Sequence, residues 1–224
     1  MLANIKYLLS SVWYAATYIL APPFCSYCKE FMKVRAVLCD ECKLMIRPVV
    51  SAKLAITRTY DIKVFALGAY EEPLQSLIRA KHHGDRIASR DLAKLFCSTG
   101  MLDAVPCDYW VPIPLHWTRF ASRGFNQATE MAAIFSQESG KPVAELLKRN
   151  KRTKFQALLS PQARLSNVKE AFSLHKQNME QYRDKHLILV DDLMTTGSTL
   201  QEAVRALRMV QPASITAVVF CRVV

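Results

Sequence analysis

LILVDDLMTTGST, residues 187–199, decides the fold class of this chain. Four apolar residues in succession, Leu187 to Val190, predict a strand that is buried on both faces of a sheet. Two carboxylates, Asp191 and Asp192, follow directly, and small residues with hydroxyl groups then lead to Thr199. A helical pattern comes next, with apolar side chains at Leu200, Ala203, Val204, Leu207 and Val210. A strand, a tight loop and a helix in this order indicate a parallel α/β sheet, in which ligands bind beyond the carboxyl ends of the strands.

The same alternation of strands and helices extends in both directions from this stretch. The pattern predicts strands at residues 63–70, 109–113 and 214–224, and helices that begin at Pro73, Asp85 and Phe125 and end near Gly84, Gly100 and Gly140. Residues 61–224 are therefore expected to form one α/β domain, with a parallel sheet flanked by helices.

The loop after the two aspartates has the chemistry of a phosphate site. The side chains of Thr195, Thr196, Ser198 and Thr199 surround Gly197 and offer hydroxyl groups beside backbone N–H groups at a helix start. Two adjacent carboxylates would repel a phosphate, but they suit ribose hydroxyls or an Mg²⁺ ion that carries a pyrophosphate. The alternative is a helix cap with two solvated acids.

Seven cysteines divide into a cluster and three scattered residues. Cys25-x-x-Cys28 and Cys39-x-x-Cys42 form two pairs separated by 10 residues, the spacing of a structural zinc site with four thiolate ligands. Redox-active or free thiols are the alternative. Cys97, Cys107 and Cys221 lie in apolar surroundings and are expected to be buried. Residues 1–60 are therefore expected to hold a zinc finger and the helix described next, and the odd cysteine count favours the cytoplasm over secretion.

The apolar segment before Cys25 is expected to be an amphipathic helix. It lacks the cleavage site of a signal peptide, and its polar residues make it a poor membrane span. One alternative is a helix packed on its own domain, and the other is a peripheral contact with the inner membrane.

The chain is basic, with 30 Lys and Arg against 19 Asp and Glu and a formal net charge of +11. This excess favours a polyanionic partner such as nucleic acid. Arg119 and Arg123 follow Pro114 in a loop after a predicted strand, and they suit pyrophosphate or DNA phosphate groups. A second basic run contains Lys151 and Arg152, with Phe155 and Tyr182 in the wider neighbourhood as aromatics that could stack on bases. Solvated surface charges are the alternative in both cases.

The 187–199 stretch resembles the phosphoribosyl pyrophosphate (PRPP) motif of type I phosphoribosyltransferases. Beyond it, the four cysteines, the V-P-x-P and R-G-F-N-Q-A segments, and an R-x-x-x-T-x-x-Q segment at residues 149–156 occur in the order typical of the ComF/ComFC family. The chain therefore resembles the phosphoribosyltransferase-like proteins of bacterial competence. The resemblance spans nearly all of its length, and the ordered set of motifs is far more specific than any one of them.

The resemblance implies the role of each site residue. Asp191 and Asp192 would be the catalytic pair and meet the ribose hydroxyls of PRPP, with Mg²⁺, while Thr195 to Thr199 would hold its 5′-phosphate. Pyrophosphate or DNA contacts would come from Lys81, Pro114, Arg119, Arg123, Lys151, Arg152 and Arg164.

Three functions remain open from the sequence. The first is a cytoplasmic protein that handles incoming single-stranded DNA beside a competence helicase and the import channel. The second is an active phosphoribosyltransferase of the nucleotide-salvage type, for which no acceptor base can be argued. The third is a binding module in which PRPP controls DNA or partner binding.

Overall fold

A computed structural model of the 224-residue chain describes residues 22–34, 36–47, 49–82, 86–115, 120–121, 124–150, 171–175 and 179–223. The chain divides into two compact units, Met1–Met45 and Ile46–Val224. The predicted amphipathic helix lies outside the described residues. The sequence placed the domain boundary at residue 60, whereas in the structure residues 46–60 belong to the second unit, because a strand within them pairs with the main sheet.

The described part of the first unit is a short loop structure followed by a helix. Phe24 and Phe31 form an isolated antiparallel bridge, and their rings meet edge to face with centroids 5.9 Å apart. Helix α2 (Asp40–Leu44) begins directly after Cys39. This arrangement brings two short segments that carry cysteines into one small unit.

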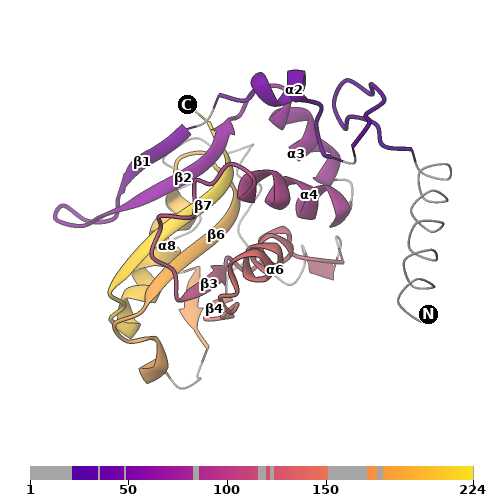
Figure 1. Cartoon of the computed structure of the whole chain (residues 1–224). Coiled ribbons are helices and arrows are strands. Elements are labelled where there is room, and N and C mark those ends of the chain that lie inside the picture. Colours follow the sequence, from indigo (N-terminus) through magenta and orange to yellow (C-terminus); the bar gives the residue numbers. More distant parts are fainter. Residues whose placement is uncertain are drawn as a thin grey trace, which may run out of the picture. The chain divides into compact units, whose positions relative to one another are not determined.

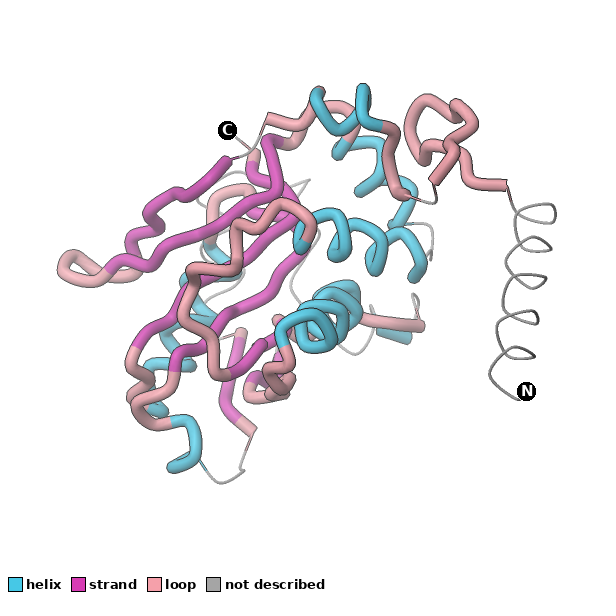
Figure 2. The backbone as a smooth tube through the Cα atoms, viewed as in Figure 1, coloured by secondary structure: helices cyan, strands magenta, loops and turns pink. Residues whose placement is uncertain are grey.

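The main sheet of the second unit contains five strands in the part of the chain that the structure describes (Figures 1 and 2). Their order is β1-β2-β7-β6-β3, with bounds β1 Val49–Ala55, β2 Asp61–Ala69, β3 Tyr109–Pro112, β6 His186–Met194 and β7 Ser214–Arg222. Strands β2, β7, β6 and β3 run parallel, and β1 is antiparallel to β2 at one edge. The predicted parallel sheet is therefore confirmed, and β6 lies inside it, as its run of apolar residues indicated.

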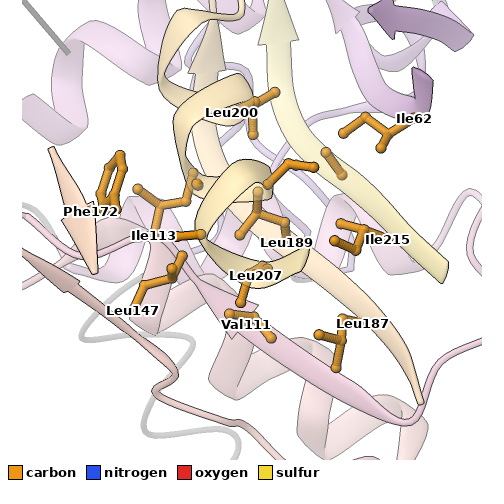
Figure 3. Close-up of a cluster of buried hydrophobic side chains, with 14 of the residues drawn as sticks. Ile62, Val111, Ile113, Leu147, Phe172, Leu187, Leu189, Leu200, Leu207 and Ile215 are labelled. Atoms are coloured by element: carbon orange, nitrogen blue, oxygen red, sulfur yellow. The ribbon is translucent and has the colours of Figure 1, made fainter. Parts of the chain in front are cut away.

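Helix α8 (Ser198–Leu207) covers one face of this sheet. Leu189 of β6, Val111 of β3 and Ile215 of β7 pack against Leu200 and Leu207 of the helix (Figure 3). Because each buried leucine contributes about 1.5–3 kcal/mol through removal of apolar surface from water, this layer fixes the start of α8 against the end of β6.

Helices α3 (Leu74–His82), α4 (Arg86–Cys97) and α6 (Gln127–Ser139) lie on the other face (Figure 1). Trp110 of β3, the neighbour of Val111 and so on the opposite face of the strand, packs on Phe135 of α6 with ring centroids 4.9 Å apart. Phe135 in turn meets Phe96 of α4 at 5.8 Å. The sheet is thus buried on both faces, which confirms the α/β class.

Two short strands, β4 (Leu147–Arg149) and β5 (Phe172–Leu174), form a separate antiparallel pair that the sequence did not predict. Leu147 and Phe172 join the core beneath α8. Two 3₁₀ helices complete the described elements: η2 (Met179–Tyr182) precedes β6, and η3 (Arg208–Val210) follows α8. The prediction that Tyr182 could stack on bases is wrong, because this side chain is buried and packs on Tyr109 with ring centroids 5.0 Å apart.

Within the described residues, which begin at Pro22, no helix is both long and apolar enough to cross a membrane.

Candidate functional site

The two aspartates lie where β6 extends beyond the end of β3. The pairing of β3 with β6 ends at Pro112 and Val190, and the N–H of Ile113 donates the last hydrogen bond to the Val190 carbonyl at 2.9 Å. On its other side β6 continues along β7 as far as Met194. Asp191 and Asp192 are therefore partly exposed at the carboxyl edge of the sheet, beside the loop that leaves β3. This is the edge where parallel α/β sheets bind ligands.

A hydrogen bond orients the first carboxylate. Oδ1 of Asp191 accepts from the backbone N–H of Asp192 at 2.8 Å. Asp191 also lines a small hollow together with Thr195, Gly197, Ser198 and Thr199, whereas Asp192 does not. Because neighbouring strand residues point to opposite faces, the two acids present their charge on different sides of β6. Asp191 and the loop of residues 195–199, called the hydroxyl loop below, thus both contribute to a single hollow.

The loop between β6 and α8 is very short and turns at Gly197. This residue has φ +78° and ψ 1° and caps the N-terminus of α8. A Cβ at this position would lie 2.6 Å from Cδ1 of Leu54 in β1. The Thr196 and Ser198 hydroxyl groups are 2.7 Å apart and hydrogen-bonded. The backbone N–H groups of the first helical turn have no partners within the helix, so this loop has the form of an anion site.

Two side chains of α8 hold the end of β1 near this loop. Gln201 Nε2 donates to the Ala55 carbonyl at 2.8 Å, and Arg205 Nη2 donates to the Ile56 carbonyl at 3.4 Å. Together with the close approach of Leu54 to Gly197, these bonds make β1 the support of the hydroxyl loop. This role of β1 was not expected from the sequence, since the strand itself was not predicted.

A cavity of about 400 Å³ lies at the carboxyl end of β3. Pro114, one of the predicted site residues, contributes to its wall. The remaining described lining residues are Pro112, Leu115, Phe120, Asn126, Thr129, Glu145, Leu147, Lys148, Arg149 and His175. Of the ionisable groups in this list, none was singled out as a site residue from the sequence, because Lys148 and Arg149 were part of a longer basic run.

The R-G-F-N-Q-A motif has a clear structural role in its second half. Asn126 caps α6 by accepting from the Ala128 N–H at 3.2 Å, and its Nδ2 donates to the Ile113 carbonyl at 2.9 Å. Phe125 and Gln127 are buried. Asn126 therefore fixes the loop after β3 to the start of α6, immediately beside the aspartates.

The other predicted basic residues have side chains outside the described part of the structure. Lys81 belongs to α3, but its side chain lies outside the described part of the structure. Also outside it are Arg119, Arg123, Lys151, Arg152 and Arg164. Their assignment to pyrophosphate or DNA stays a prediction.

The four clustered cysteines meet in the first unit. All four Sγ atoms lie within 4.8 Å of one another, and the Cys28 and Cys39 sulfurs are 3.7 Å apart. A disulfide would need about 2.05 Å, whereas a tetrahedral zinc ion with bonds of about 2.3 Å separates its sulfurs by about 3.8 Å. The geometry and the all-thiol donor set therefore fit a zinc ion.

The backbone around Cys25 prepares this cluster for a thiolate. Burial raises the pKa of the Cys25 thiol, but backbone hydrogen bonds from Cys39, Cys28 and Tyr27 together lower it to about 6. Burial raises the pKa of Cys42 well above its usual range. Of the scattered cysteines, Cys221 is buried as predicted, while Cys97 and Cys107 are only half-buried.

The comparisons with known proteins identify the family. The Phosphoribosyl transferase domain family matches residues 120–223. Competence protein F of Haemophilus influenzae is 33% identical over 195 residues, which cover 83% of this chain and 79% of that protein. The chain belongs to the ComF/ComFC competence protein family. Competence protein ComFC of Bacillus subtilis is 30% identical over 82% of this chain and 70% of its own length. DNA utilization protein YhgH of Escherichia coli K12 is 28% identical over 88% of this chain and 89% of that protein.

Membership of the ComF/ComFC family agrees with the fold. The matched domain contains β6, the hydroxyl loop, α8 and β7, and the parallel sheet with helices on both faces is the type I phosphoribosyltransferase fold. The resemblance that rested on ordered motifs is thus confirmed.

Proposed function

We propose that this protein handles incoming single-stranded DNA during natural transformation and carries a PRPP-binding site of the phosphoribosyltransferase type. The observation that carries the proposal is the hollow that Asp191 shares with Thr195, Gly197, Ser198 and Thr199 at the carboxyl edge of the sheet. The role in transformation follows from the names of relatives that match most of the chain, two competence proteins and a DNA utilization protein.

The hollow suits the phosphorylated end of PRPP. The N–H groups at the start of α8 and the hydroxyl groups of Thr195 and Thr199 would bind the 5′-phosphate, while Asp191 and Asp192 would bind the ribose hydroxyls. Mg²⁺ bound with PRPP would neutralise its pyrophosphate oxygens. Since the carboxylates lie on different faces of β6, Asp191 is expected to be the closer of the two to the phosphate loop.

The DNA site is proposed to use the basic residues predicted from the sequence. Phosphate contacts are assigned to Lys81, Arg119, Arg123, Lys151, Arg152 and Arg164, together with Pro114. The net charge of +11 supports such a polyanionic partner. A competence helicase, components of the import channel and the inner face of the membrane are proposed neighbours, and the cytoplasm is the proposed location.

The four cysteines are proposed to hold one structural zinc ion. Four thiolates close its coordination shell, so the ion would supply folding energy to the small first unit and no open position for catalysis.

A catalytically active phosphoribosyltransferase is the second candidate function. It is favoured by the complete acidic and hydroxyl loop, since a protein that bound only DNA would have little use for carboxylates near its phosphates. Catalysis would come from positioning and from neutralisation of the leaving pyrophosphate. Release of pyrophosphate from PRPP with one of the nucleobases would support this activity, and its absence with every base tested would remove it.

The DNA proposal is tested by titration of a fluorescently labelled single strand at low and rising salt. The wild-type protein should bind, and Lys151→Ala with Arg152→Ala should reduce the salt slope by about one to two phosphate contacts. Arg58→Ala with Lys63→Ala is the control of equal charge, since both residues are exposed near the amino end of β2. Absence of binding at low salt would refute the proposal, and equal slopes in the two variants would remove the basic run from the site.

A further inference from the structure

The cavity at the carboxyl end of β3 shares no described residue with the PRPP hollow. It has positive groups at Lys148 and Arg149, the imidazole of His175, and one carboxylate, Glu145. Lys148 and Arg149 lie on β4, and His175 directly follows β5. The backbone N–H of His175 donates to the Leu146 carbonyl at 2.9 Å. The β4–β5 pair therefore presents its charged side chains at this cavity.

Arg149 is held in a defined position. Its guanidinium lies over the ring of Phe172, 5.2 Å from the centroid, and its Nη1 donates to the Pro114 carbonyl at 3.5 Å. Phe172 is also its partner in the register of β4 with β5. An arginine that is already ordered loses little side-chain entropy when it binds a phosphate, and its planar fork suits that ligand.

The remaining wall of the cavity is mostly apolar, with Asn126 and Thr129 as its uncharged polar residues. Pro112, Leu115 and Leu147 line it, with Phe120 half-exposed at its margin. About 400 Å³ is within the usual range for a small-molecule site and would accommodate one nucleotide, but no folded macromolecule. An apolar wall with a nearby aromatic ring offers a surface for a base, and basic groups offer a place for its phosphate.

We propose that this cavity binds one phosphorylated nucleotide unit, with the phosphate at Lys148 and Arg149 and the base or sugar on the apolar wall, where Glu145 accepts from an N–H or O–H group. The inference rests on the proposed function, because the unit is taken to be a nucleotide of the bound single strand. Since Pro112 pairs with Val190, the cavity lies directly beside the aspartate edge. The bound DNA strand would thus pass next to the hollow at Asp191 that is proposed to bind PRPP.

Lys148→Glu tests this inference, and Lys185→Glu is the matched control. Both lysines are exposed and both variants change the charge equally, but Lys185 precedes β6, at the opposite end of the strand from the aspartates. Two probes are used at low salt. One is a labelled oligo-dT strand, and the other is free dTMP, whose binding is measured by calorimetry. Lys148→Glu should weaken binding of the strand by about tenfold, because a negative charge replaces a positive one near a phosphate, while Lys185→Glu should change it less than about twofold. Far-UV circular dichroism confirms that each variant is folded.

The outcomes separate this inference from the general DNA proposal. Selective loss of strand binding in Lys148→Glu supports the cavity as part of the strand's path. Selective loss of dTMP binding alone, without any strand binding by the wild type, supports the nucleotide site but refutes the strand as its source, and with it the DNA proposal. Equal effects of Lys148→Glu and Lys185→Glu on both probes overturn the inference, even if the wild type binds DNA strongly. Failure of both probes to bind the wild type also overturns it.

Discussion

Substitution of Gly197 by alanine tests the reasoning that gives the hydroxyl loop its shape. This residue caps α8 in the left-handed region, with φ +78°, and a Cβ would lie 2.6 Å from Cδ1 and 3.2 Å from Cδ2 of Leu54. Two costs therefore add: the backbone conformation is unfavourable for any L-residue, and the leucine has to move. Gly140 provides a control, because its φ is +69° but nothing lies within 4 Å of an added Cβ.

The expected loss of stability is larger for Gly197→Ala than for Gly140→Ala. The left-handed conformation alone costs an alanine about 1–2 kcal/mol, so this is the whole expected effect of Gly140→Ala. At Gly197 the contact adds about 1 kcal/mol and not more, because the obstructing atoms are the end of a half-buried side chain that can move to an off-rotamer position. The expected totals are about 1–2 kcal/mol for Gly140→Ala and about 2–3 kcal/mol for Gly197→Ala. In a domain of this size each kcal/mol lowers Tm by about 2–4 °C.

Urea and thermal unfolding of both variants measure these costs, and titration with Mg²⁺ and PRPP measures the effect on the proposed site. Gly197→Ala should be the less stable variant and should also weaken PRPP binding, whereas Gly140→Ala should leave PRPP binding unchanged. Wild-type stability in both variants would refute the argument from positive φ. Equal stability loss in the two would show that Leu54 does not restrain the loop.

Three further predictions concern the metal, the carboxylates and the scattered thiols. Purified protein should contain about one zinc per chain by metal analysis, and Cys42→Ala should lose most of it; zinc-free wild-type protein whose clustered thiols all titrate would contradict the four-thiolate site. Asp191→Asn with Asp192→Asn should lower the affinity for Mg²⁺-PRPP at least about tenfold and leave the free energy of unfolding unchanged, since Asn keeps the size of Asp and one acceptor oxygen but replaces the other oxygen with a donating NH2 group and removes the charge; unchanged affinity in calorimetry would contradict the assignment. Burial raises the pKa of Cys97 to about 11 and that of Cys107 to about 12, so at pH 8 Cys97 should react with iodoacetamide about two orders of magnitude more slowly than a free thiol, and Cys107 about three; labelling at the rate of free cysteine would mean that these thiols are not shielded.

The strands and helices of the second unit could largely be predicted from the sequence, because their apolar patterns are long. The run at residues 187–190 and the helical stripe from Leu200 gave β6 and α8, and Gly140 ended α6 in the left-handed conformation typical of a helix C-terminus. The end of β6 differs from the prediction, which stopped the strand at Val190. The strand continues to Met194 because β7 still pairs with it there, and polar residues such as Asp191 carry no local signal for such pairing.

Three strands were missed because their signals are short or distant in the sequence. Strands β4 and β5 have three residues each, and the two are joined only across the segment 150–171, so no local turn announces them. Strand β1 has an irregular register with β2, between Val49 and Ala52, which disturbs the alternating pattern. These pieces support the hydroxyl loop and carry Arg149, so the missed part of the fold is also the missed part of the candidate site.

The cysteine cluster was predictable for a different reason. Each C-x-x-C pair brings its two thiols together locally, the first pair at a turn and the second at the start of α2. The basic residues show the opposite limit: charge spacing alone did not separate Arg149, which is held between Phe172 and the Pro114 carbonyl, from its neighbours in the basic run.

The most direct test of the central claim is fluorescence anisotropy of a labelled single strand with Mg²⁺, with and without excess PRPP, in the wild type and in Asp191→Asn with Asp192→Asn. We expect the strand to bind at low salt, PRPP to shift the binding curve of the wild type, and the double variant to bind DNA without responding to PRPP. A wild-type protein that binds no strand at low salt, or a strand affinity to which PRPP makes no difference, would contradict the claim that one edge of this sheet serves both ligands.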